Sequence, residues 1–189
     1  MSNELKEIKS RLLQHASPEA RMAHEKFVPG KERIIGVRTP VLNQLAREYQ
    51  MGGFALVERL WKAGSLEEKI LAGKMLGRIA KKDPERALRL VERFSETIGN
   101  WAVCDTIGMQ SLKPIVLTHE REIFGLAGRL NGSEDFWQRR LSLVLVEWYT
   151  RYKRLLPAIK KLVKGVENDE EYYVRKAVMW VRKNLEKGK

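Results

Sequence analysis

Residues 65–106 read SLEEKILAGKMLGRIAKKDPERALRLVERFSETIGNWAVCDT, and three helix starts fall within them. Ser65-Leu66-Glu67-Glu68 is a capping box, because the serine hydroxyl accepts a backbone N–H three residues on and Glu68 reaches back. Asp83-Pro84-Glu85 places a capping side chain before a proline at the first helical position. Asn100 is a favoured residue at the N-cap of the next helix. These residues therefore predict two successive helices and the beginning of a third.

The helix starts recur along the chain at a nearly constant interval. First helices of successive pairs are expected near Glu67, Trp101, Asp135 and Glu171, and second helices near Pro84, Glu120 and Pro157. Upstream helices are expected at 3–15, 18–27, 40–50 and 53–63, with capping starts at Ser17-Pro18-Glu19 and Thr39-Pro40 and a turn at Gly52-Gly53. Two helices per roughly 35–45 residues are typical of an α-solenoid of the HEAT or armadillo type. The alternative is a plain helical bundle with accidental spacing.

The composition is that of one ordinary globular domain spanning residues 1–189. The chain is 43% hydrophobic and 32% charged, which excludes disorder as the main state. No apolar run approaches the roughly 20 residues of a membrane span, and the N-terminus lacks the apolar core of a secretory signal. The single cysteine, Cys104, excludes an intramolecular disulfide framework and a cysteine-based zinc site, so we expect a reducing, cytoplasmic compartment.

The net charge points to a polyanionic partner. Thirty-six Lys and Arg against 24 Asp and Glu give a formal charge of +12. Residues 137–189 carry 14 basic and six acidic residues, which places +8 of that charge in the C-terminal part. Such an excess favours nucleic acid over a membrane surface as partner, although a solvated surface explains it equally well.

Equivalent positions of successive repeats are expected to line a concave basic groove, because stacked pairs expose one helix of each repeat on the inner side. Trp101 and Asp105 are four residues apart and share a helix face. Arg140 lies at the edge of the next core stripe. The last helix places Trp180 between Lys176 and Lys183. Aromatic rings beside cations suit a nucleic-acid strand.

A carboxylate in a basic groove repels phosphate, so its presence calls for a function other than binding the DNA backbone. Stabilising a cationic substrate or a developing positive charge would be such a function. Each residue also has an ordinary structural interpretation: tryptophans often belong to the core, an aspartate in the first turns answers the helix dipole, and an arginine beside an apolar stripe snorkels or forms an ion pair.

The sequence resembles the HEAT-like-repeat DNA alkylation repair glycosylases. The matching segments are Gly36-Val37-Arg38-Thr39-Pro40-Val41-Leu42-Asn43-Gln44-Leu45, Trp101-Ala102-Val103-Cys104-Asp105, Trp137-Gln138-Arg139-Arg140 and Val174-Arg175-Lys176-Ala177-Val178-Met179-Trp180-Val181-Arg182. They occur in the family's order over nearly the whole chain.

The resemblance implies excision of cationic N3- and N7-alkylated purines from duplex DNA without base flipping. It places the family's catalytic aspartate on Asp105, its aromatic partners on Trp101 and Trp180, and its phosphate-binding arginine on Arg140. Arg38 and Thr39 fall in its matching helix start, and Lys176 and Lys183 are further candidates for DNA phosphates. No metal, organic cofactor or obligate protein partner is implied.

The remaining candidates for chemistry are weak. His15, His24 and His119 lack the spacing of metal ligands. Cys104 has no evident histidine partner, so we interpret it as a small core residue and not as a nucleophile. The competing hypothesis to the glycosylase is a non-catalytic helical-repeat module that binds nucleic acid or an acidic protein through the same groove.

Overall fold

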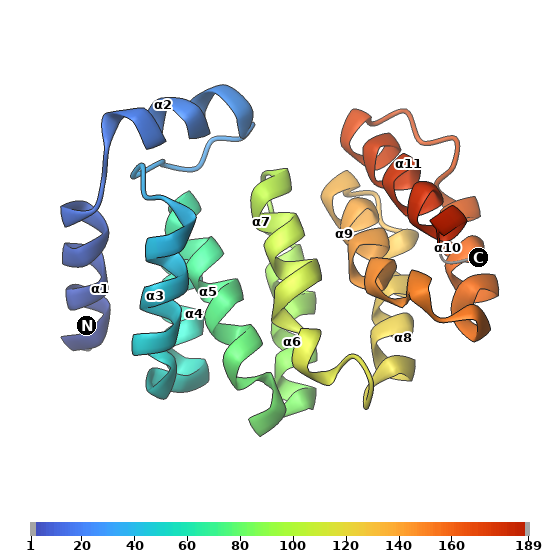
Figure 1. Ribbon diagram of the computed structural model, residues 1–189, viewed down its shortest axis with the longest axis horizontal. Helices are drawn as coiled ribbons and strands as arrows, with labels where there is room; N and C mark the ends of the chain where they lie inside the picture. Colours follow the sequence, from blue (N-terminus) through green and yellow to red (C-terminus); the bar gives the residue numbers. More distant parts are fainter. Residues whose placement is uncertain (1–2, 188–189) are drawn as a thin grey trace.

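The computed structural model describes residues 3–187 and contains eleven α-helices and no strand among those residues (Figure 1). This confirms the all-α class expected from the sequence. The helices are α1 Asn3–Gln14, α2 Pro18–Phe27, α3 Thr39–Glu48, α4 Gly53–Ala63, α5 Leu66–Ile79, α6 Pro84–Ser95, α7 Trp101–Thr106, α8 Glu120–Asn131, α9 Phe136–Glu147, α10 Leu156–Gly165 and α11 Tyr172–Lys187. Short 3₁₀ turns join several of them, and a π-helical segment, Ile107–Ser111, continues α7.

The helices from α3 onward alternate between two rows (Figure 1). In the first row α3 packs on α5, α5 on α7, α7 on α9, and α9 on α11; the second row holds α4, α6, α8 and α10. The helices α5, α7, α9 and α11 begin at residues 66, 101, 136 and 172, each within one residue of the expected start. This regular interval is consistent with a helical-repeat solenoid.

Capping side chains determine where three first-row helices begin. The Ser65 hydroxyl accepts from the Glu68 N–H, and the Glu68 side chain accepts from the Ser65 N–H, which completes the expected capping box. Asn100 accepts from the Val103 N–H at 2.9 Å. Asp135 accepts from the backbone N–H groups of residues 137 and 138. The same local chemistry therefore starts these three helices.

The start of α3 differs from the expectation. Thr39 was expected to cap this helix, but it occupies the first helical position, and Arg38 is at the N-cap without a side-chain capping bond. The preceding backbone is held by another element: the buried Glu67 carboxylate of α5 accepts from the N–H groups of Ile35, Gly36 and Val37 at 2.9, 2.7 and 3.2 Å. This tertiary contact, rather than a local cap, positions the start of α3.

A continuous apolar core lies between the two rows, and glycines bring the first-row helices close together. A Cβ on Gly77 of α5 would lie 2.4 Å from the Gln110 carbonyl oxygen, and one on Gly108 would lie 2.5 Å from Val144 of α9. Cys104 is fully buried, which confirms its interpretation as a core residue. None of the described helices combines the length and apolar character that crossing a lipid bilayer requires.

Helix α2 stands apart from both rows. It lies across the end of the array at which α3 and α7 begin (Figure 1). Ala20 is its one buried residue among those described, and Met22 and Phe27 are largely exposed. It contacts the first row through His24, whose Nδ1 lies 3.4 Å from Glu67 Oε1 of α5, and through a contact with α7 described below.

Candidate functional site

The site forms around an ion pair between two neighbouring first-row helices. Arg140 of α9 donates from Nε to Asp105 Oδ1 of α7 at 3.1 Å, and from Nη2 to Oδ1 and Oδ2 at 2.8 and 3.0 Å. Such a planar, multidentate contact fixes the orientation of the carboxylate as well as its position. The two residues are 35 positions apart in sequence, one repeat, so the stacking of the helices creates this pair.

Arg140 also reaches a third helix. Its Nη1 donates to the Tyr173 carbonyl oxygen in the first turn of α11, at 2.7 Å. The residue is 7% exposed and all three guanidinium nitrogens have partners within the protein. The sequence pattern placed Arg140 at the edge of the core stripe, and the resemblance implied a phosphate as its partner. In the structure it is enclosed, and it joins α7, α9 and α11.

Burial and the Arg140 partner shift the pKa of the Asp105 carboxyl group in opposite directions. Burial raises its pKa, and the Arg140 charge and hydrogen bonds lower it, with a net upward shift from the ordinary value. The side chain is nevertheless 26% exposed, so solvent and a ligand reach it. By contrast, burial raises the pKa of the neighbouring Cys104 thiol, which keeps it protonated and unreactive at neutral pH. The reachable charged group is therefore the aspartate.

Trp101 lies one turn before Asp105, at the start of α7. Its indole Nε1 donates to the Phe27 carbonyl oxygen of α2 at 2.9 Å, and the ring is half-buried. The indole edge is thus tied to α2 across 74 positions of sequence. This contact fixes the ring at the start of α7, and the short sequence motif around Trp101 gives no indication of it.

The predicted residues of α11 occupy the neighbouring part of the first row. Trp180 is half-buried against the core, and Lys176 and Lys183 are exposed. The Lys176 ammonium lies 5.4 Å from the centroid of the Tyr172 ring. Within residues 3–187 no hydrogen bond or aromatic contact joins Trp180 to Asp105 or Trp101; the link between the two helices is Arg140.

Arg38 and Thr39 lie at the other side of the array, at the start of α3. Both are exposed. They directly follow the segment that Glu67 holds by its three backbone hydrogen bonds. The structure therefore places them in the same row as Asp105, separated from α7 by α5. The supporting role of Glu67 was missed, because an acidic residue in a first helical turn ordinarily indicates an interaction with the helix dipole.

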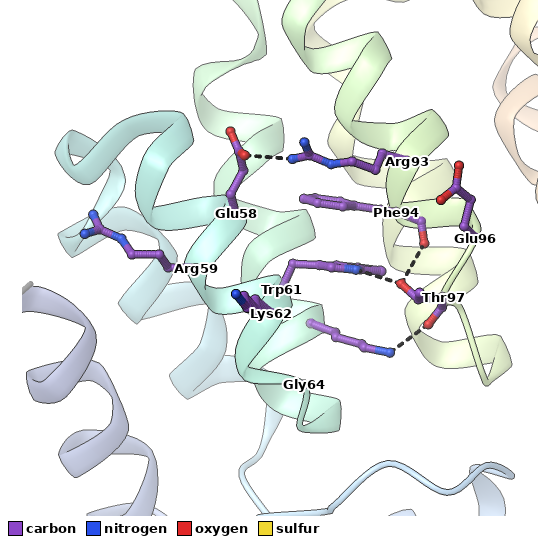
Figure 2. A pocket seen from close by; sticks show the side chains of 10 residues that line it. Glu58, Arg59, Trp61, Lys62, Gly64, Arg93, Phe94, Glu96 and Thr97 are labelled. Carbon is purple, nitrogen blue, oxygen red and sulfur yellow. Dashed lines mark hydrogen bonds and ion pairs between the residues drawn. The ribbon is translucent and has the colours of Figure 1, made fainter. Parts of the chain in front are cut away.

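A separate hollow of about 620 Å³ lies on the second row, between α4 and α6 (Figure 2). Its aromatic residues are already covered on both faces. Trp61 stacks on Phe94 with centroids 4.2 Å apart, and the Lys69 ammonium lies 5.3 Å from the Trp61 ring on the other side. This hollow offers no free ring for a base or sugar, and it shares no lining residue with the ion-pair site.

Among the described residues, no group of three or more His, Cys, Asp or Glu side chains has an arrangement that holds a metal ion. The ion-pair site itself offers one carboxylate oriented by a buried guanidinium, with the Trp101 indole one turn earlier on α7. A fixed carboxylate of this kind stabilises positive charge that develops close to it.

Comparison with known proteins identifies the relatives of this fold. The sequence model of the family described as DNA alkylation repair enzyme matches residues 8–187. A solved structure from Enterococcus faecalis, described as a predicted DNA alkylation repair enzyme, superposes with a TM-score of 0.75 at 18% identity, over 92% of this chain and 84% of that one. The comparison with curated protein sequences found no significant match.

Proposed function

The chain belongs to the DNA alkylation repair enzyme family, and from that membership and the geometry around Asp105 we propose that it is a DNA glycosylase. Its substrates are cationic N3- and N7-alkylated purines in duplex DNA. The single observation that carries the proposal is the Asp105 carboxylate, partly exposed yet oriented by a buried arginine in a strongly basic chain.

The chemistry of an alkylated purine suits a lone carboxylate. The C1′–N9 bond breaks, both electrons leave with the base, and the positive charge of the purine is neutralised. The sugar becomes oxocarbenium-like, and Asp105 stabilises its charge through space. Water then attacks C1′ and gives up a proton, for which the carboxylate is a nearby acceptor. The substrate brings its own activated leaving group, so no metal and no acid for the base are needed.

The neighbouring residues act as supports for this step. Arg140 holds both carboxylate oxygens, so its first role is to position Asp105; the phosphate contact expected of it stays a prediction. Trp101 and Trp180 offer electron-rich ring faces to the polarised sugar. Lys176, Lys183, Arg38 and Thr39 are exposed on the same row of helices and contact the DNA backbone in this proposal.

Excision without base flipping is part of the proposal. Enzymes that flip a nucleotide bind it in a close-fitting pocket. The hollow in Figure 2 lies on the other row of helices and has no free aromatic face, which supports a reaction in which the lesion stays in the duplex.

The test is release of 7-methylguanine from duplex DNA under single-turnover conditions. Asp105→Asn removes the negative charge and keeps the side-chain shape, and we expect the rate to fall by about 100-fold or more. Asp169→Asn is the matched control, because Asp169 also pairs with an arginine of α9, Arg139, away from the site. Its rate should stay that of the wild type.

Thermal melting of both variants checks that the fold is intact. Tight, salt-sensitive binding of DNA without any release of base by the wild type would contradict the glycosylase and favour the non-catalytic module. Equal loss of rate in the two variants would show that Asp105 acts only through stability.

A further inference from the structure

A buried lysine of α5 lacks a carboxylate partner. Lys74 is 9% exposed, and its Nζ donates to the neutral Gln110 side-chain oxygen at 3.1 Å. No ion pair of Lys74 is present among the described residues. An ammonium with three donors and one neutral acceptor is an unfavourable group to bury, and such groups concentrate at binding sites.

The surroundings of this amine are cationic. Lys74 lines a hollow of about 430 Å³ together with Arg78 and Lys113, and the other lining residues are Gly77, Met109, Gln110 and Pro114. No carboxylate lines it. Arg78 also has a neutral partner, since its Nε donates to the Gln50 side-chain oxygen at 3.3 Å. Three cations thus converge on one hollow without a counter-charge in its lining.

Two lining residues of the hollow lie on the same element as the proposed catalytic residue. Met109 and Gln110 follow Asp105 by four and five residues, in the π-helical segment that continues α7. Gly77 lets that segment approach α5 closely, because any side chain there would collide with the Gln110 backbone. Met109 and Gln110 are thus about one helical turn further along the same element than Asp105. Single turns of π-helix within α-helices are frequent at functional sites.

We propose that this hollow, formed by Lys74, Arg78 and Lys113, binds a backbone phosphate of the DNA strand that carries the lesion. The inference rests on the proposed function, which brings that strand to Asp105. The acceptors of Lys74 and Arg78 within the protein are neutral side-chain oxygens. A phosphate supplies several negatively charged oxygens in their place.

The burial of Lys74 also favours a bound anion in this hollow. It lowers the pKa of Lys74, and a bound phosphate would reverse that shift. A solvated surface charge does not explain the residue, because its side chain is almost entirely enclosed. An internal ion pair does not explain it either, because its partner is an amide.

The first experiment measures the affinity for undamaged duplex DNA as a function of salt. Lys74→Met removes the charge and keeps the volume, and it should lower the slope of log Kd against log salt by about one. Lys62→Met is the matched control, an exposed lysine on α4 in the other row, and its slope should stay that of the wild type. An unchanged slope for Lys74→Met would overturn the proposal.

Gln110→Glu provides a second variant that keeps the lysine. It gives Lys74 the missing carboxylate, so the melting temperature should rise while DNA affinity falls and the salt slope drops by about one. A variant that melts higher but binds DNA with the wild-type slope would contradict a phosphate in this hollow. This pair of readouts separates loss of the anion site from loss of the fold.

Inorganic phosphate distinguishes a small anion from the DNA backbone. If phosphate raises the melting temperature of the wild type but not of Lys74→Met, at matched ionic strength, the hollow is an anion site. The same result with an unchanged DNA salt slope would overturn the DNA assignment and leave free phosphate as the ligand. Failure of the glycosylase appears separately: no base is released by the wild type, whatever the slope.

Discussion

Asp105 shows how one residue is adjusted by two opposing neighbours. Enclosure between helices makes its ionisation less favourable, and Arg140 makes it more favourable. Because the net shift is upward, the folded protein holds this proton more tightly than the unfolded chain. Ionisation of Asp105 therefore lowers the free energy of unfolding as the pH rises from the ordinary pKa to the raised one. The charge that the proposed reaction uses is thus held at some expense of stability.

The pH dependence of base release follows from that shift. In the proposed reaction the ionised carboxylate is the active form, so the single-turnover rate should fall as the pH drops through the raised pKa of Asp105, above its ordinary value of 3.8. Rates measured from about pH 4 to pH 8, after subtraction of spontaneous depurination, would show this limb. Asp105→Asn should show none. A limb centred at or below the ordinary value would contradict the effect of burial.

At the scale of elements, the first-row helices meet through glycines. Gly77 of α5 and Gly108 next to α7 occupy positions where a methyl group would collide with a neighbouring helix. In the interior of an exposed helix the same residue is merely a weak helix former. Replacing glycine by alanine therefore lowers the free energy of unfolding where the methyl group collides with a neighbouring helix, and raises it in an exposed helix. The sign of the change tests how closely two helices approach.

Gly77→Ala should lower the free energy of unfolding by about 1–3 kcal/mol, because the added methyl group displaces the Gln110 backbone. Gly128→Ala on α8 is the matched control, since nothing lies within 4 Å of its added Cβ. It should raise the free energy by about 0.5–1 kcal/mol through helix propensity. Urea denaturation of both variants measures the difference. Stabilisation by both would show that α5 and the π-helical segment are further apart than described.

At the scale of the whole molecule, stability is distributed unevenly. The first-row helices α5 and α9 bury most of their residues between their neighbours, whereas α2 buries Ala20 alone among its described residues. Yet α2 supplies the carbonyl that holds Trp101. The least buried helix therefore supports an aromatic residue of the proposed site.

Hydrogen exchange should reveal this uneven distribution of stability among the helices. Amides of α2 should exchange at least about 100-fold faster than those of α5 and α9, once corrected for intrinsic rates, because local opening exposes little apolar surface. Mass spectrometry of peptic fragments resolves these helices. Equal protection across α2, α5 and α9 would mean that the array opens only as one unit.

The helices and their repetition could be predicted from local sequence signals. Helix caps act within three residues, as at Ser17, Ser65, Asp83, Asn100 and Asp135. The spacing of apolar residues acts within a turn or two, so both signals can be recognised in the sequence. The one misplaced cap, Thr39, is where Glu67 holds the backbone from about 30 residues away.

The partners of the charged groups, by contrast, depend on how the helices stack. The sequence placed Asp105 and Arg140 one repeat apart, but stacking joined them, enclosed the arginine and tied Trp101 to α2. It also left Lys74 with an amide and two further cations. The physical reason is that the burial and neighbours of a side chain depend on how whole helices approach one another, which no local pattern encodes.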